Sequence, residues 1–289
     1  YKCFCTALKE GTVCHQKEEA ARALGTLARN KGKQMATAAA DGIAPLVALV
    51  QRGNDRQKEE AAWALGTLAE NEDNKIAIAA ARGIAPLVAL VQLGNDRQKE
   101  EAARALGNLA EKIEDNQIAI AEAGGIEPLV ALIRSGSEEQ KEQAAAALRN
   151  LAWNNDNQRA IAGAGGIKPL VALIRSGSEE QKEQAAGALG SLAWNNDANQ
   201  RAIAGAGGIE PLVALIRSGS EGQKEASGSE GQKGQAAAVL AKAAGALRYL
   251  AWNNDDNQRA IAGAGGIEPL VALALVALIR SGSENHVGQ

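Results

Sequence analysis

Residues 165–194 read GGIKPLVALIRSGSEEQKEQAAGALGSLAW, and this stretch decides the fold. Its first part recurs as Gly-Ile-x-Pro-Leu-Val-Ala-Leu around every proline of the chain: Pro45, Pro86, Pro128, Pro169, Pro211 and Pro269. The prolines are spaced by 41, 42, 41, 42 and 58 residues. A second block, Gln-Lys-Glu-x-Ala-Ala, recurs in the same register. The chain is therefore an array of repeats of about 42 residues.

Each repeat is predicted to contain three helices. In residues 155–194, a first helix spans about 157–163, with Asn155 as its N-cap and a glycine pair at its end. A second helix starts near Pro169, because a proline fits the first helical turn, where its missing N–H would be unpaired anyway.

The third helix of the same repeat follows Ser178. Gln181 completes a Ser-x-x-Gln capping box, and the helix continues to Trp194. Apolar residues, among them Leu189 and Leu192, recur at helical spacing and form one stripe. A single repeat cannot bury this stripe alone, whereas stacked repeats can.

The period, the Gly-Gly-Ile-x-Pro-Leu-Val second helix and the Ala-Leu-Arg-Asn-Leu third helix together resemble the armadillo repeat. HEAT repeats have a similar period but usually two helices, and the Gly-Gly pair argues against them. The resemblance implies an all-α fold, a right-handed superhelical solenoid of three-helix armadillo repeats. We divide the chain into a partial leading repeat (1–30), repeats at 31–71, 72–112, 113–154, 155–195 and 196–254, and a partial terminal repeat (255–289).

Two insertions interrupt the pattern. The 58-residue spacing carries 16 extra residues. Nine of them come from a duplication with a nine-residue offset, in which 227–233 repeats 218–224, and seven lengthen a third helix by about two turns. We expect a mobile loop at about 218–235, because glycine and serine dominate it. Five extra residues at about 271–275 stretch the last second helix. Genuine insertions and a gene-assembly artefact are both open interpretations.

Composition limits the partners. The net charge is −3, so no basic field favours a nucleic acid. No stretch approaches the roughly 18–20 apolar residues of a membrane span. The first residues lack the pattern of a signal peptide, and the three cysteines do not form a disulfide framework, so we expect an intracellular protein, cytoplasmic or nuclear or both.

Motifs for chemistry are missing from the sequence. It contains no HExxH, GxSxG or P-loop motif, so we expect neither an enzyme nor a cofactor. Cys3, Cys5, Cys14 and His15 are the ligand types of a zinc site. Their spacing is unusual for structural zinc, and a divergent leading half-repeat is the favoured interpretation, so no metal site is predicted.

The resemblance also implies that third helices line a concave groove that holds an extended segment of a partner. The apolar stripe sets the register of the outward side. If Ala61, Leu65 and Leu68 point inward, steps of three or four residues place other side chains outward. These outward side chains are Glu59, Trp63, Thr67 and Glu70.

Acidic, aromatic and amide side chains recur on this outward side. Glu59, Glu100, Glu142 and Glu183 favour a basic partner segment, and a solvated helix face is the alternative. Trp63, Trp153, Trp194 and Trp252 offer the rigid contact area typical of interfaces. The last three stand at third-helix ends, where packing under the next repeat is the alternative.

Asn108 and Asn150 are candidates to clamp a peptide backbone, because an amide both donates and accepts hydrogen bonds. In the nuclear-import adaptors of the family, the third helix carries Trp-x-x-x-Asn. Here no repeat holds both residues, since Trp63 is followed by Thr67 and Asn108 is preceded by Arg104. The sequence therefore resembles the generic scaffold members more than the import adaptors.

We predict a protein–protein interaction scaffold that binds an extended, possibly basic, segment of a partner along the groove of third helices. A structural solenoid arm with no groove ligand, which self-associates through uncapped ends, is one alternative. Import-adaptor-like binding of basic peptides is another.

Overall fold

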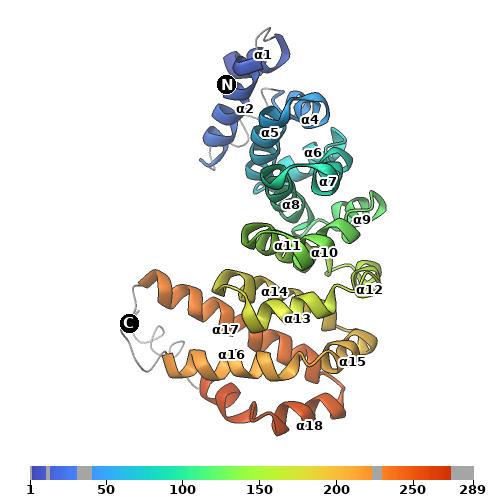
Figure 1. The fold of residues 1–289 in the computed structure, drawn as a ribbon, viewed down its shortest axis with the longest axis vertical. Helices are drawn as coiled ribbons and strands as arrows, with labels where there is room; N and C mark the ends of the chain where they lie inside the picture. Colours follow the sequence, from blue (N-terminus) through green and yellow to red (C-terminus); the bar gives the residue numbers. More distant parts are fainter. Residues whose placement is uncertain (1, 11–13, 31–40, 223–229, 275–289) are drawn as a thin grey trace, which may run out of the picture. The chain divides into compact units, whose positions relative to one another are not determined.

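The computed structural model describes residues 2–10, 14–30, 41–222 and 230–274, and every element within these ranges is an α-helix (Figure 1). The all-α prediction is confirmed, whereas the handedness of the solenoid stays a prediction. The chain divides into two compact units, residues 1–164 and 165–289.

In its described residues, the first unit contains four pairs of a second and a third helix. The second helices are α1 (Lys2–Glu10), α4 (Ile43–Arg52), α7 (Ile84–Leu93) and α10 (Ile126–Ser135). The third helices are α2 (Cys14–Ala28), α5 (Asp55–Leu68), α8 (Asp96–Ala110) and α11 (Glu138–Leu151). The first helices are α6 (Glu72–Ala80), α9 (Glu114–Glu122) and α12 (Asn155–Gly163).

The second unit continues the same order. It contains α13 (Ile167–Ser176), α14 (Glu179–Ala193), α15 (Asp197–Gly205), α16 (Ile209–Gly222), α17 (Glu230–Ala251) and α18 (Asp255–Gly263). Residues 267–274 form a further second helix.

Capping boxes start the third helices where the sequence predicts them. At α14 the side chain of Ser178 accepts a hydrogen bond from the backbone N–H of Gln181, and the side chain of Gln181 accepts one from the N–H of Ser178. Asn54, Asn95 and Ser137 begin α5, α8 and α11 in the same way. These boxes satisfy backbone donors that a helix start leaves unpaired.

The predicted cap of the first helix is displaced by one residue. Asn154, not Asn155, is the N-cap of α12, and its side chain accepts from the backbone N–H of Asp156 and Asn157. The shift arises because Asn154 has the extended backbone that a cap requires, whereas Asn155 is already helical.

Buried amides join each first helix to the third helix before it. Asn116 donates to the carbonyl of Leu109 at 2.9 Å, and Asn199 and Asn257 donate in the same way to Leu192 and Leu250. The acceptors are last-turn carbonyls that have no partner within their own helix. These bonds fix the turn between the two helices.

Third helices within a unit pack directly on one another, α2 with α5, α5 with α8, α8 with α11, and α14 with α17. Their stripe is fully buried: Ala61, Leu65 and Leu68 are each 0% exposed, as predicted. Small residues allow the approach, since a Cβ added at Gly107 would lie 3.3 Å from the Cα of Ala147 on α11.

The insertion in the second unit is more helical than predicted. α17 has 22 residues where α14 has 15, which matches the predicted seven-residue lengthening. The predicted loop at about 218–235 is wrong at both ends, because α16 continues to Gly222 and α17 begins at Glu230. Extending an existing helix costs little free energy compared with starting a new one, and this segment contains no proline that would end the helix. Residues 223–229, and the end of the predicted insertion at 271–275, lie outside the described residues.

The close approach of third helices gives a stability prediction. Gly107→Leu should destabilise the fold by about 1–3 kcal/mol, because the new side chain must push α11 away from α8. Gly245→Leu is the matched control, since a Cβ there meets nothing within 4 Å and the site is inside α17. Denaturant midpoints compare the two variants, and equal midpoints would contradict the packing account.

Candidate functional site

Three glutamates recur one repeat apart on consecutive third helices of the first unit. Glu59, Glu100 and Glu142 lie on α5, α8 and α11, and we call them the acidic ladder. All three are half-buried. They are placed by the capping box that starts each helix, five residues before each glutamate.

Two carboxylates of the acidic ladder are held in unfavourable surroundings. Burial raises the pKa of Glu59 above its ordinary value, and the neighbouring carboxylate of Glu60 raises it further. Burial likewise raises the pKa of Glu100, and Glu101 adds to the effect. Nearby arginines, Arg97 foremost, offset these effects only in part, so both pKa values remain raised.

The adjacent lysines do not neutralise the acidic ladder where their ion pairs are seen. Lys141 pairs with Glu138 at 2.8 Å, three residues away on the same helix. Lys182 pairs with Glu179 at 2.7 Å. In the second unit, Glu183 accepts a hydrogen bond from the side chain of Gln235 at 3.0 Å.

Trp63 packs between helices rather than standing free. Its ring lies against α2 so closely that a Cβ on Gly25 would meet ring carbons at 2.2–3.0 Å. The guanidinium of Arg29 lies over the ring, 5.4 Å from its centroid. Trp63 is half-buried and joins α2 to α5.

The other three tryptophans follow the ends of third helices and remain partly exposed. Trp153 is 50% exposed in the first unit, and Trp194 and Trp252 are 38% and 63% exposed in the second. Trp194 is the C-cap of α14, and the other two stand just after α11 and α17. Each therefore presents aromatic surface to solvent.

The two candidate clamp asparagines bind the chain itself. Asn108 donates its side-chain N–H to the carbonyl of Gly66 on α5, at 2.9 Å. Asn150 donates to the carbonyl of Gly107 on α8, also at 2.9 Å, and accepts from Arg149 at 3.3 Å. Asn150 is only 8% exposed. Both amides therefore hold neighbouring third helices together.

The predicted outward register is wrong at one position. Thr67 is 2% exposed, and its hydroxyl donates to the carbonyl of Trp63 at 3.0 Å. The helix α8 packs on α5, and its Asn108 donates to the carbonyl of Gly66, next to this position. A helix wheel drawn for one repeat cannot include this neighbour.

Sequence reasoning gave no role to two arginines that lie on the same face. Arg22 on α2 binds Glu60 on α5, and Arg104 on α8 binds Glu101. The second pair is visible in the sequence as a three-residue spacing on one helix. The first joins residues 38 positions apart and requires the structure.

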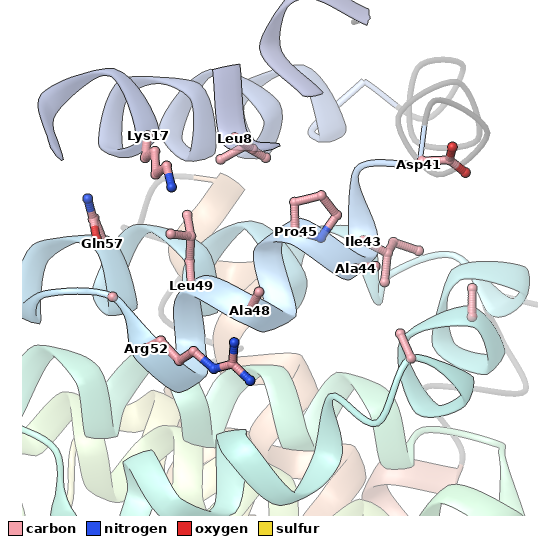
Figure 2. Close-up of a pocket in the computed structure, with 13 residues that line it drawn as sticks. Leu8, Lys17, Asp41, Ile43, Ala44, Pro45, Ala48, Leu49, Arg52 and Gln57 are labelled. Atoms are coloured by element: carbon pink, nitrogen blue, oxygen red, sulfur yellow. The ribbon is translucent and has the colours of Figure 1, made fainter. Parts of the chain in front are cut away.

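Two hollows lie beside second helices. One, of about 800 Å³, is bordered by Leu8, Lys17, Pro45, Leu49 and Arg52 along α4. Figure 2 shows Lys17 reaching from α2 toward α4, with Asp41 at the opposite end of the hollow. The other, of about 620 Å³, has the equivalent lining one repeat later, including Lys58, Pro86 and Leu90. Neither contains a residue of the acidic ladder.

The described ranges contain neither a cluster of metal-ligand residues nor a single helix suited to a membrane. No group of three or more His, Cys, Asp or Glu residues is placed there to hold a metal ion. Cys3 is exposed and Cys5 buried, and His15 pairs with Glu19 at 3.0 Å. No single described helix is long and apolar enough to cross a bilayer, although α6 and α7, bent by 83°, meet that test as a pair.

The buried amide gives a prediction that requires no ligand. Asn150→Ala should lower the free energy of unfolding by about 1–3 kcal/mol, because the carbonyl of Gly107 loses a buried donor. Asn108→Ala should lower the free energy of unfolding by less, since Asn108 is only half-buried. Denaturant unfolding of both variants checks the order, and an unchanged Asn150→Ala midpoint would contradict the assigned role.

Comparisons with known proteins agree with this architecture. The armadillo/beta-catenin-like repeat family matches residues 114–153 and 154–194, and the HEAT-like repeat family matches 15–68 and 55–109. Among curated proteins, none matches the chain.

Solved structures of engineered proteins are similar to the chain over most of its length. One is 32% identical with a TM-score of 0.75, covering 86% of this chain and 95% of its own. Another is 34% identical with a TM-score of 0.75, covering 93% and 72%. A designed armadillo repeat protein in complex with the peptide (KR)4 is 26% identical, with a TM-score of 0.70, covering 83% and 98%. With its repeated three-helix units and these matches, the chain belongs to the armadillo repeat family.

Proposed function

We propose that the chain is a protein-interaction scaffold that holds an extended, basic segment of a partner against its third helices. The binding surface, called here the third-helix face, is formed by α5, α8 and α11 around the acidic ladder. At least one cationic side chain of the partner pairs with the acidic ladder, first at Glu59, while the partner's backbone runs across the helices.

The observation that carries this proposal is the acidic ladder itself, three half-buried glutamates one repeat apart on consecutive third helices, and burial raises the pKa of two of them, Glu59 and Glu100. Folding places both carboxylates where burial and a neighbouring glutamate disfavour their charge. Carboxylates whose charge is disfavoured by burial and by a like charge occur often at functional sites. A cation bound next to these carboxylates stabilises their charged form. The free energy that disfavours the charges in the free protein therefore adds to the affinity for a cationic partner.

A similar designed protein supports the same chemistry. Its complex contains a peptide of alternating lysine and arginine. Within the described residues, the side-chain oxygen of Asn108 accepts no hydrogen bond, so it is available to a peptide N–H. Asn150 has both amide atoms engaged and is not assigned to the partner.

A structural arm is the second candidate. Ile267 and Val271 are 57% and 52% exposed, whereas the equivalent Ile167 and Val171 on α13 are 6% and 3% exposed. An apolar helix face of this kind favours packing against another protein surface. This candidate requires no ligand on the third-helix face.

A charge-removal experiment tests the scaffold proposal. Glu59→Gln should weaken binding of a fluorescent lysine-containing peptide by about three- to tenfold, the range for a partly desolvated ion pair. Glu127→Gln on α10 is the matched control, because it removes the same charge from an exposed second-helix position. Fluorescence anisotropy measures both affinities. Equal affinities, or no binding to the wild type, would reject the proposal.

Binding should also depend on pH in a defined direction. Besides burial, Glu60 and Glu101 raise the pKa of Glu59, while Arg97 and Arg56 lower it, and the sum is a raised pKa. As pH falls from neutral, Glu59 protonates before an ordinary glutamate, so peptide affinity should already decline above the usual glutamate range.

The same shift acts on the free fold with the opposite sign. The folded chain binds this proton more tightly than the unfolded chain, so Glu59 stabilises the fold as pH falls through its raised pKa. Peptide affinity that rises or stays constant on mild acidification would contradict the assignment of Glu59 to the binding surface.

A further inference from the structure

Arg22 and Arg104 occupy equivalent places in the repeat, on α2 and α8, and the same place on α5 holds Trp63. Each guanidinium group pairs with a glutamate next to the acidic ladder. These glutamates are Glu60 and Glu101, which directly follow Glu59 and Glu100 in the sequence.

Arg22 reaches from one third helix to the next. Its Nε and Nη2 atoms both donate to Oε1 of Glu60, at 2.9 and 2.6 Å. The side chain of Glu60 is 13% exposed, whereas that of Arg22 is 48% exposed. Arg22 therefore covers the carboxylate from the solvent side, as a cation from a partner would.

Arg104 makes an equivalent contact on α8. Its Nε and Nη2 atoms donate to Oε2 of Glu101 at 2.9 and 2.7 Å. Nη2 also donates to the carbonyl of Trp63 at 3.1 Å, which ties the side chain to α5. The guanidinium is held by two helices, so displacing it costs more than breaking a simple surface ion pair.

Glu59 stands next to Glu60 on α5, close enough to Glu101 to be affected by its charge, and differs from both pairs. Among the described residues it makes no ion pair and no hydrogen bond, and it is half-buried. The nearby Arg97 pairs with Glu100 instead, at 3.5 Å. Glu59 therefore has no directly paired cation among the described residues, although Arg97 and Arg56 lie near enough to lower its pKa.

We infer that Arg22 and Arg104 act as built-in competitors on the third-helix face and select a partner segment that carries one cationic side chain among uncharged residues. The inference rests on the proposed function and adds which carboxylates of the third-helix face a partner can reach. A single lysine reaches Glu59 without displacing either arginine. A continuous run of lysines meets two fixed guanidinium groups, and like charges placed together oppose its binding.

The test compares peptides on wild type and variants. The probes are fluorescent nine-residue peptides of alanine, serine and glycine that carry no lysine, one central lysine or five lysines. The variant Arg22→Gln/Arg104→Gln removes both guanidinium groups and keeps helix-forming side chains. Thermal melting checks that it folds.

The matched control is Arg159→Gln/Arg259→Gln. Each of these exposed arginines pairs with an aspartate three residues earlier, Asp156 and Asp256, on a first helix. The control removes two positive charges of the same kind away from the third-helix face.

The readout is the ratio of the Kd for the one-lysine peptide to the Kd for the five-lysine peptide. In the wild type this ratio should be below about threefold, and in Arg22→Gln/Arg104→Gln it should rise by at least about fivefold, as two carboxylates become available. The control should leave it unchanged. A ratio that does not rise in the variant, or that rises equally in the control, overturns the inference.

The failure of the proposed function gives a different result. Suppose that Glu59→Gln weakens the binding of both lysine peptides, while the Kd ratio in Arg22→Gln/Arg104→Gln equals that of the wild type. The face then binds basic segments, and selection by the two arginines is rejected. If neither lysine peptide binds more tightly than the peptide without lysine, in any variant, both proposals are rejected.

Discussion

The close contact between neighbouring third helices is the constraint on which the rest of the structure depends. A Cβ on Gly66, Gly107 or Gly190 would lie 3.3 Å from the backbone of the next third helix. This approach buries the alanine and leucine stripe that no repeat can bury alone. It also sets the distance between successive members of the acidic ladder.

The same closeness explains why polar side chains cross between repeats. Asn108 and Asn150 reach carbonyls of the preceding third helix, and Arg104 reaches the carbonyl of Trp63. Third helices set farther apart would leave these bonds unmade. The packing of small residues therefore also sets the arrangement of the candidate site. On the same face, Arg22 and Arg104 pair with Glu60 and Glu101, which stand next to the acidic ladder.

Features that repeat along the sequence were predictable, and features that join repeats in space were not. The Ser178 and Gln181 capping box and the burial of Leu65 and Leu68 follow from local spacing, so the sequence predicts them correctly. The burial of Thr67, the packing of Trp63 on Gly25 and the ion pair of Arg22 with Glu60 depend on an adjacent helix about 40 residues away. Periodicity gives the position of that helix in the chain but not the side chains that meet across it.

The most direct measurement follows the four tryptophan indole N–H resonances of the labelled chain while the one-lysine peptide is added. Trp63 stands on the third-helix face beside Glu59, whereas Trp252 follows α17 in the other unit. The account predicts that the Trp63 resonance shifts and saturates, that the Trp252 resonance does not move, and that Glu59→Gln reduces the shift at equal peptide concentration. A shift confined to Trp194 and Trp252, or no shift at saturating peptide, would contradict the central claim that the third-helix face of the first unit binds a basic segment.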